Sequence, residues 1–410
     1  MNTVEIVNTP ASAPALRAIP YPYRALLAIC SDLDETPDRH VFGEITRYLN
    51  TTAATSMGPG VGLEVGNSIY FDMPPEQFSY WNTDDAGRAM VRELIRSGHV
   101  DCLHSYGDLA ASRGDAGRAL DELSRHGCAL TVWIDHAVAP TNFGADIMRG
   151  TGDVPGAAAY HADLTCGFGV RHVWRGRVTS VIGQNTRRRL RGIWTPRHPL
   201  ASARTLAKEA VKGLVGRRAG AKYAMHPPNA VLREALLRDG RPVLEFLRAN
   251  PYWRAVDEGE TAEGLGEVLT PGMLARLVER GGACVLYTHL GKIRRRDDML
   301  GPRSRAALAH LAGLYREGRV LVTTTRRLLD YCAAKGSASC RWTAREGRSL
   351  LELTTDPAFP ADGLTVYAPQ PGPVQMALNG GAPRDLPLNP PDASGRRSVS
   401  VPWRRLEFPG

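Results

Sequence analysis

Long apolar runs, closely spaced cysteine pairs and a signal-peptide core are all missing from this sequence. No stretch approaches the roughly 20 apolar residues that span a bilayer. Residues 1–18 contain Pro10 and Pro14 and lack the apolar segment of a secretory signal. The seven cysteines form no C-x-x-C pair and lie mostly in apolar segments such as 25–30 and 283–286, which is typical of free thiols in a reducing compartment. We therefore expect a cytoplasmic protein without a transmembrane segment.

Positive charge is concentrated in one part of the chain, the basic segment 171–222. This segment holds fourteen Lys or Arg residues and one acid, Glu209, a local net charge of +13 in a chain whose total is +9. It is either a solvated charged surface or a phosphate-binding one, which would contact a nucleotide- or lipid-diphosphate-linked sugar or touch an acidic membrane face peripherally. The few aromatic residues near it, Trp174, Trp194 and Tyr223, make no stacking platform for bases. We therefore expect no nucleic-acid partner.

Helical and strand-like segments alternate from about residue 20 to residue 335. This alternation predicts a largely parallel sheet, arranged either as an α/β barrel or as an open α/β sheet. A helical span is expected within 228–247. After Gly336, short β-prone runs are separated by turns rich in Pro, Gly and Asp, which is typical of a small β sandwich. The predicted parts are an N-terminal extension (1–19), an α/β domain (20–337) and a small β-rich domain (338–410).

Residues 98–108 combine an expected strand with two potential metal ligands. The strand begins at Val100 and ends near His104, and Asp108 follows four residues later. From the turn after a strand, an imidazole and a carboxylate at this spacing can reach one cation. The segment therefore predicts part of a metal site.

Two other expected strands also end in ionisable residues. An apolar strand at 25–31 leads to Asp32 and Asp34, whose side chains point to the same face of an extended chain. A second strand, at 283–288, ends at His289, which is well placed as a general acid near neutral pH. Sites of α/β folds lie at the carboxyl ends of parallel strands, so we expect these side chains to share one rim.

A further expected strand, 129–134, is followed by Asp135 and His136, and Asn142 comes soon after. These residues stand on the same predicted rim. We expect them to bind substrate, to orient His289 or to supply a replacement metal ligand.

The segment 98–108 resembles the second motif of polysaccharide deacetylases of the NodB type, G-H-x-x-x-x-H-[ST]-x-x-H. The matching residues are Gly98, His99, His104 and Ser105. Asp108 stands where that family has its last histidine. The D-x-D of Asp32 and Asp34 is similar to the family's T-F-D-D motif, and the strand that ends in His289 is similar to its fifth motif. The third motif, R-x-P-[YF], has no close match where it is expected.

This resemblance implies a deformed parallel (β/α) barrel and a divalent metal ion, with Zn²⁺ expected, held by Asp34, His104 and Asp108. It implies Asp32 as the general base and His289 as the general acid that protonates the departing amine. The implied reaction removes an N-acyl group, with acetyl expected, from an amino sugar. The implied substrate is a surface polysaccharide such as an O antigen, or its nucleotide- or lipid-linked precursor.

Two other functions remain open at this point. The segment 32–36 also fits the D-x-D-x-[TV] motif of haloacid-dehalogenase-type phosphatases, which use Mg²⁺. That fold needs paired acids after a downstream strand, and the candidate pair, Asp297 and Asp298, follows three arginines instead. The missing third motif is also compatible with a degenerate deacetylase fold that binds glycans without catalysis.

Overall fold

The computed structural model describes residues 15–32, 34–187, 194, 199–218, 226, 229–251, 261–345 and 348–410. The chain divides into two compact units. The α/β unit consists of Ala25–Leu329 together with Arg405–Gly410, and the β unit consists of Met1–Arg24 together with Asp330–Arg404. The division differs from the expected boundaries because the N-terminal residues join the C-terminal strands and the last six residues return to the α/β unit.

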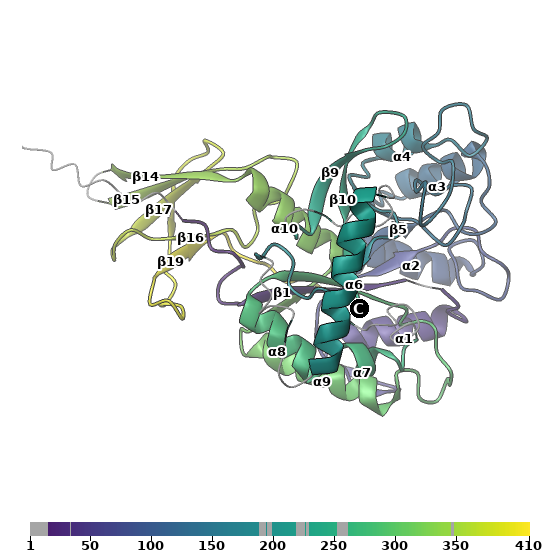
Figure 1. Cartoon of the computed structure of the whole chain (residues 1–410), viewed down its shortest axis with the longest axis horizontal. Coiled ribbons are helices and arrows are strands. Elements are labelled where there is room, and N and C mark those ends of the chain that lie inside the picture. Colours follow the sequence, from purple (N-terminus) through teal and green to yellow (C-terminus); the bar gives the residue numbers. More distant parts are fainter. Residues whose placement is uncertain are drawn as a thin grey trace, which may run out of the picture. The chain divides into compact units, whose positions relative to one another are not determined.

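A curled sheet forms the centre of the α/β unit (Figure 1). In spatial order its path runs β8 (Val178–Thr179), β11 (Arg248–Ala249), β12 (Ala283–Thr288), β1 (Ala25–Ser31), β4 (Asn67–Ile69), β5 (Val100–His104), β6 (Val132–Ile134), β7 (His172–Trp174), β10 (Pro242–Phe246) and β9 (Leu232–Leu236). An eleventh strand, β13 (Val320–Thr323), pairs with the first half of β1. The central strands β1, β5 and β12 are buried along their whole length, and β1 and β12 are mostly apolar, as is typical of strands covered on both faces.

The curled sheet is a half-barrel, which is consistent with the barrel-like α/β fold that the sequence resemblance implied. Its path ends at β8 and β9, which do not pair with each other in the described part of the chain. All of its ladders are parallel except that of β9 with β10. The expectation of a largely parallel α/β sheet is therefore confirmed, and closure is not found.

The antiparallel pair corrects the expected helix within 228–247. Strands β9 and β10 form a hairpin there, with Asp239 and Gly240 in the turn. Gly240 has a φ of 86°, a backbone conformation that glycine adopts without strain. An Asp-Gly pair between two β-prone runs is a strong hairpin signal, and it accounts for the hairpin found here.

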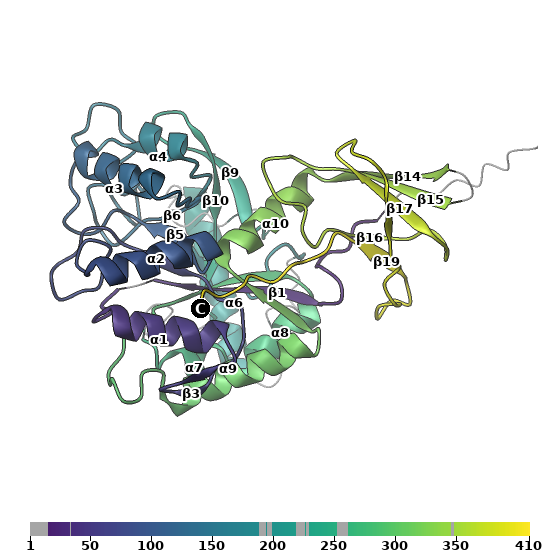
Figure 2. The ribbon, with the colours of Figure 1, turned by 180° about the vertical axis from the view of Figure 1, so that it is seen from behind.

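Two groups of helices pack on the sheet through separate hydrophobic clusters. The first group comprises α1 (Arg39–Asn50), α7 (Leu265–Val268), α8 (Pro271–Arg280) and α9 (Gly301–Arg316). The second comprises α2 (Asp85–Ser97), α3 (Arg113–Arg125) and α4 (Ala162–Phe168). Figure 2 shows α1 and α2 from behind, and Figure 1 shows the long helix α6 (Pro199–Arg218). A minor pair, β2 (Ala54–Thr55) with β3 (Gly58–Pro59), follows α1.

Capping residues determine where the helices begin and end, as α2 illustrates. Asp84 caps the start of α2 by accepting a hydrogen bond from the Gly87 N–H. Gly98 ends the helix in the left-handed conformation with a φ of 83°, two residues before β5 begins. The helix end therefore aims the chain into the strand that carries His104.

The β unit contains two small sheets, as its sequence composition predicts. One has the order β14 (Ser339–Arg345), β15 (Arg348–Thr354), β17 (Val374–Leu378) and β18 (Arg384–Leu386), and the other pairs β16 (Thr365–Tyr367) with β19 (Ser398–Ser400). Leu16 forms a bridge to Val366, and Arg17 makes an ion pair of 3.1 Å with Asp392, which ties the N-terminal residues to this unit. Helix α10 (Thr325–Ser337) contributes residues to both units.

Among the described residues, no helix combines the length and the apolar character needed to cross a bilayer.

Candidate functional site

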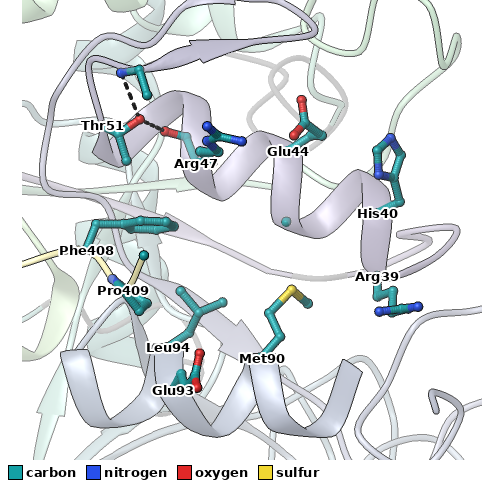
Figure 3. A pocket seen from close by; sticks show the side chains of 13 residues that line it. Arg39, His40, Glu44, Arg47, Thr51, Met90, Glu93, Leu94, Phe408 and Pro409 are labelled. Atoms are coloured by element: carbon teal, nitrogen blue, oxygen red, sulfur yellow. Dashed lines mark hydrogen bonds between the residues drawn. The ribbon is translucent and has the colours of Figure 1, made fainter. Parts of the chain in front are cut away.

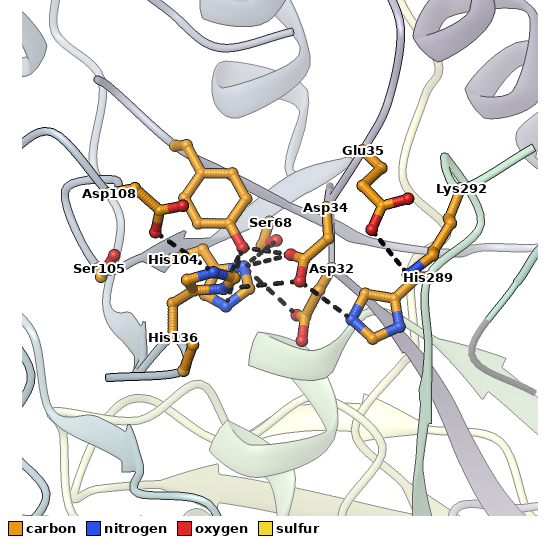
Figure 4. A network of polar contacts seen from close by, with 12 residues as sticks. Asp32, Asp34, Glu35, Ser68, His104, Ser105, Asp108, His136, His289 and Lys292 are labelled. Carbon is orange, nitrogen blue, oxygen red and sulfur yellow. Dashed lines mark hydrogen bonds and ion pairs between the residues drawn. The ribbon is translucent and has the colours of Figure 1, made fainter. Parts of the chain in front are cut away.

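Ionisable side chains converge at the carboxyl ends of six neighbouring strands, as the sequence predicted for α/β folds. Figure 4 shows how the labelled members of this group point toward one another. Most of them end or follow a strand, whereas Ser68 lies inside β4 and Arg248 begins β11. The members of the group are Asp32, Asp34, Ser68, Tyr70, His104, His136, Arg248 and His289. Asp32, His104 and His289 are almost completely buried. Ionisable groups this deep in a protein need partners or a bound ion.

Asp34, His104 and His136 form a cluster with the geometry of a metal site. One ligand atom from each residue lies within 4.8 Å of the other two. The Nδ1 atom of His136 lies 3.5 Å from Asp34 Oδ2. Burial lowers the pKa of His104 to about 3, which keeps its imidazole neutral and able to bind a cation. Two imidazole nitrogens and one carboxylate oxygen are a donor set that suits Zn²⁺.

Asp108 was predicted as the third ligand, but His136 stands in that place and Asp108 lies behind it. The Oδ1 atom of Asp108 is 3.3 Å from His136 Nε2, the ring nitrogen that faces away from Asp34. The difference arises in the turn after β5, where Ser105 and Gly107 both have positive φ and redirect the chain. A Cβ at Gly107 would lie 2.0 Å from the Asp72 carbonyl oxygen, so this turn requires glycine. Asp108 therefore lies behind His136, the position that carboxylates commonly take behind metal-bound histidines.

Asp135 and Asn142 hold the loop that presents His136. The buried Asp135 carboxylate accepts hydrogen bonds from Trp133 Nε1 at 2.7 Å and from the backbone N–H groups of Phe143 and Gly144 at 2.8 and 2.7 Å. Asn142 accepts from the His136 N–H at 3.0 Å and donates to the His136 carbonyl oxygen at 2.7 Å. The geometry therefore brings His136 into the candidate metal cluster, and Asp135 and Asn142 support the loop that carries it.

Asp32 is fixed by an arginine that sequence reasoning missed. Arg248 donates two hydrogen bonds to its carboxylate, of 2.5 and 2.8 Å, in the bidentate form. The Arg248 guanidinium is buried, with its centre 4.0 Å from the Trp174 ring centroid and 4.9 Å from that of Tyr287. A signal was present in the sequence, since residues 248–252 read R-A-N-P-Y, one residue longer than R-x-P-[YF].

His289 lies against Asp34 on another side of that carboxylate. Its Nε2 atom is 3.4 Å from Asp34 Oδ2 and 3.3 Å from the Tyr287 hydroxyl. Burial alone lowers the pKa of His289, but the hydrogen bond to Asp34 and the charge of that carboxylate outweigh it and raise the pKa. Burial raises the pKa of Asp34, and the hydrogen bond from His289 and the neighbouring imidazoles outweigh it, so this pKa lies well below its usual range. The pair therefore favours a carboxylate beside an imidazolium.

Tyr70 places its hydroxyl among the candidate ligands, and nothing in the sequence motifs pointed to it. The hydroxyl oxygen lies 2.6 Å from His136 Nδ1 and 3.3 Å from His104 Nε2, and it donates a short hydrogen bond to Asp34. The Tyr70 ring is stacked on His104, with centroids 4.3 Å apart. At the rim of the site, Lys292 pairs with Glu35 at 2.8 Å.

We compared the chain with protein-family models, curated proteins and solved structures, and none of the three searches finds a match. The resemblance to polysaccharide deacetylases therefore rests on the short motifs, and the site has to be judged by its own geometry.

Part of the basic segment 171–222 is internal. Arg175 and Arg177 pair with the fully buried Glu245 at 3.2 and 2.8 Å. Helix α6 supplies Lys208 and Lys212, which donate to Ser180 and to the Val178 carbonyl oxygen. The Arg-rich run that begins at Arg187 continues outside the described residues. The local charge of +13 therefore overstates what this segment offers to an anion.

A cavity of about 720 Å³ lies between α1 and α2 (Figure 3). Phe408 lines it, and the neighbouring Leu406 N–H is anchored to Glu64 at 2.9 Å. The other labelled lining residues include Arg39, Glu44 and Met90. Its lining, within the described part of the chain, contains none of the residues of the candidate metal site.

Proposed function

We propose that this protein is a metal-dependent N-deacylase that removes an acyl group, with acetyl expected, from an amino sugar. The observation that carries the proposal is the Asp34, His104 and His136 cluster, with Asp32 and His289 beside it. This combination supplies a cation site, a fixed carboxylate and an imidazole with a raised pKa within one group of strand ends. Amide hydrolysis with a metal ion needs these three components.

Asp34, His104 and His136 would hold the ion, with Asp108 behind His136. A divalent ion in such a site acts as a Lewis acid toward the acyl carbonyl and lowers the pKa of water. Asp32 accepts the proton of the attacking water, and Arg248 holds its carboxylate in one orientation for that task. His289 donates a proton to the departing amine, which leaves poorly without one.

The substrate class is proposed from the sequence motifs and from charge. We propose an amino-sugar unit of a surface polysaccharide such as an O antigen, or of its nucleotide- or lipid-linked precursor met in the cytoplasm. The exposed part of the basic segment 171–222 would attract the phosphates of such a precursor. A nucleic-acid partner remains unexpected, because that segment has few aromatic residues.

The phosphatase alternative is less compatible with the environment of Asp32. That alternative uses Asp32 as a nucleophile and Asp34 as an acid/base, whereas Asp34 lies in the cluster with His104 and His136. It leaves His104, His136 and His289 without a role. A non-catalytic glycan-binding protein would bind no metal ion and show no deacylase activity. Measurements of metal content and activity therefore distinguish that alternative from the proposal.

The proposal predicts one equivalent of a zinc-like ion per chain, measured by plasma emission analysis. The chelated protein should be inactive and should recover N-deacetylase activity on an amino-sugar amide when Zn²⁺ is returned. A chain that binds no such ion, or that needs Mg²⁺ and hydrolyses phosphate esters, would overturn the proposal.

A matched pair of variants tests the ligand assignment. His136→Ala should lose the ion, because one of the three clustered ligands is gone. Asp108→Asn should keep the ion but raise its dissociation constant by roughly 10- to 100-fold, the usual effect of a group behind a ligand. Loss of the ion from Asp108→Asn with retention by His136→Ala would restore Asp108 as the third ligand.

A further inference from the structure

Helix α6 runs along the outside of the α/β unit (Figure 1) and contacts it through polar side chains. Lys208 Nζ donates to the Ser180 hydroxyl oxygen at 3.1 Å, and Lys212 Nζ donates to the Val178 carbonyl oxygen at 3.1 Å. Among the described residues of α6 only Ser202 is buried, and none belongs to either of the two hydrophobic clusters. A surface helix ordinarily packs on its protein through its apolar side. The orientation of α6 is therefore the reverse of the usual one.

The solvent-facing side of α6 is a continuous apolar stripe. The stripe consists of six exposed residues, Leu200, Ala203, Ala207, Ala210, Val211 and Leu214. At 3.6 residues per turn these six positions fall within an arc of about 100°. Its large members Leu200, Val211 and Leu214 are 76, 57 and 59% exposed, and exposed apolar side chains that gather on one face mark an interaction surface.

The charge of α6 indicates what kind of surface the stripe fits. The helix contains five Lys or Arg residues and one acid, Glu209, which gives a net charge of +4. Arg204 is exposed and borders the stripe, because it lies one turn after Leu200 and two turns before Val211. An anionic bilayer offers both parts that this face requires, namely apolar chains for the stripe and phosphates for the cations.

A second copy of the chain fits the same face less well. A two-fold symmetric dimer through the stripe would place two α6 helices against each other. Each of them carries a net charge of +4, and Arg204 of both copies would border the same interface. Repulsion between like charges opposes this contact, whereas the same charges favour an anionic surface.

We propose that α6 is an interfacial helix that binds the protein to the surface of an anionic phospholipid bilayer. The helix lies parallel to the bilayer plane, with the stripe among the acyl chains next to the headgroups and Arg204 at the level of the phosphates. From Leu200 to Leu214 the contact extends about 21 Å along the helix axis, at 1.5 Å per residue. This inference goes beyond the proposed function and does not depend on the metal site.

The test is sedimentation of the full-length protein with two kinds of vesicle, one of phosphatidylcholine alone and one that also contains phosphatidylglycerol. The protein should bind the vesicles with phosphatidylglycerol at least about 10-fold more tightly, because several cations near the surface each add to the attraction. This preference should shrink as salt is added. Arg204→Gln should weaken binding to the anionic vesicles only.

A matched pair of variants tests the apolar stripe. Leu214→Gln should bind the anionic vesicles about 10-fold more weakly than the parent, because a polar amide replaces a side chain that enters the acyl region. Leu236→Gln is the control, since Leu236 lies in β9 and is 65% exposed, and this variant should bind like the parent. Both side chains are exposed, so neither substitution should unfold the protein, which circular dichroism checks.

Three results would overturn the inference. The first is a parent protein that binds neither kind of vesicle, and the second is an equal effect of Leu214→Gln and Leu236→Gln. The third is a dimer in sedimentation velocity, without lipid, that Leu214→Gln dissociates, because the stripe would then bind a second copy of the chain. Each of these results leaves the Zn²⁺ content and the deacylase activity of the proposed function untouched.

Discussion

At the scale of single residues, the contact between His289 and Asp34 decides when the site can donate a proton. The neighbouring carboxylate raises the pKa of His289 above its ordinary value of 6.5. A proton donor works only below its pKa, so activity should persist above pH 6.5 and fall at more alkaline pH. In His289→Ala this alkaline limb should disappear, the metal should stay, and turnover should fall by roughly 10²–10⁴-fold. The measurement is the pH–rate profile of both proteins with an N-acetyl amino sugar.

The leaving group provides the control for this prediction. An activated ester expels a weakly basic phenolate that needs no proton, so its hydrolysis should suffer much less in His289→Ala than amide hydrolysis. Equal losses on the two substrates would assign His289 to positioning and not to proton donation.

Residues in local patterns were predictable, and residues that act through long-range contacts were not. Asp32, Asp34, His104 and His289 follow apolar strands, and this pattern alone indicated that they meet at one rim. Tyr70 lies inside an apolar aromatic run, where nothing distinguishes a residue of the site from a core residue. Its role depends on which strands become neighbours of β4, and no local spacing encodes that.

At the scale of elements, the loop after β6 depends on one carboxyl group. Asp135 accepts hydrogen bonds from one indole and two backbone N–H groups, and burial raises its pKa to about 7. Asp135→Ala leaves those three donors without their acceptor, so the free energy of unfolding should fall by roughly 3 kcal/mol. Because the same loop presents His136, the dissociation constant for Zn²⁺ should rise about 10-fold. Urea unfolding and chelator competition measure the two effects.

The exposed Asp121 on α3 supplies a control for loss of charge. Asp121→Ala should change the unfolding free energy by less than about 0.5 kcal/mol and leave Zn²⁺ binding unchanged. If both variants behave alike, Asp135 does not support the loop in solution.

Helices and strands were predictable where residues within the element itself mark its beginning and end. Helices such as α2 and α8 carry a capping residue, an amphipathic span and a terminal glycine, so their sequence marks both ends. The expected helix within 228–247 was wrong, because the Asp239-Gly240 turn favours a hairpin there. The turn after β5 was also not predicted, since Ser105 has a φ of 43°, a conformation that serine rarely adopts.

At the scale of the whole molecule, buried histidines make the stability of the α/β unit depend on pH. Burial lowers the pKa of five of them to about 3 or 4, namely His99, His104, His161, His172 and His226. Each takes up a proton on unfolding below pH 6.5, so each contributes stability that is lost as the pH falls from 6.5 toward 4. Burial also raises the pKa of Asp101 to about 6 and of Asp135 to about 7. These two acids release a proton on unfolding in the same window and oppose the histidines.

Five histidines against two acids leave a net uptake of about three protons near pH 5. The free energy of unfolding of the chelated protein should therefore fall by roughly 4 kcal/mol per pH unit between pH 6 and pH 5. Urea unfolding at half-unit pH intervals measures this slope. Stability that is flat or rises on acidification across that range would contradict the buried, neutral state of these histidines.

The alternation of helices and strands predicted the parallel sheet but not whether it closes. Closure depends on the pairing of the first and last strands of the path, β8 and β9, which are separated by the long helix α6. Pairing at such a distance leaves no trace in local periodicity. The same limit explains the unit boundaries, since Leu16 joins the β unit through a bridge to Val366.

The order of the site residues along the chain has a consequence for biosynthesis. The proposed ligands Asp34, His104 and His136 end or follow β1, β5 and β6, whereas Arg248 lies in β11 and His289 follows β12. A ribosome that adds about 5–20 residues per second releases His289 roughly 8 to 30 seconds after His136. The nascent protein therefore carries every residue of the proposed metal site before it carries the proposed proton donor.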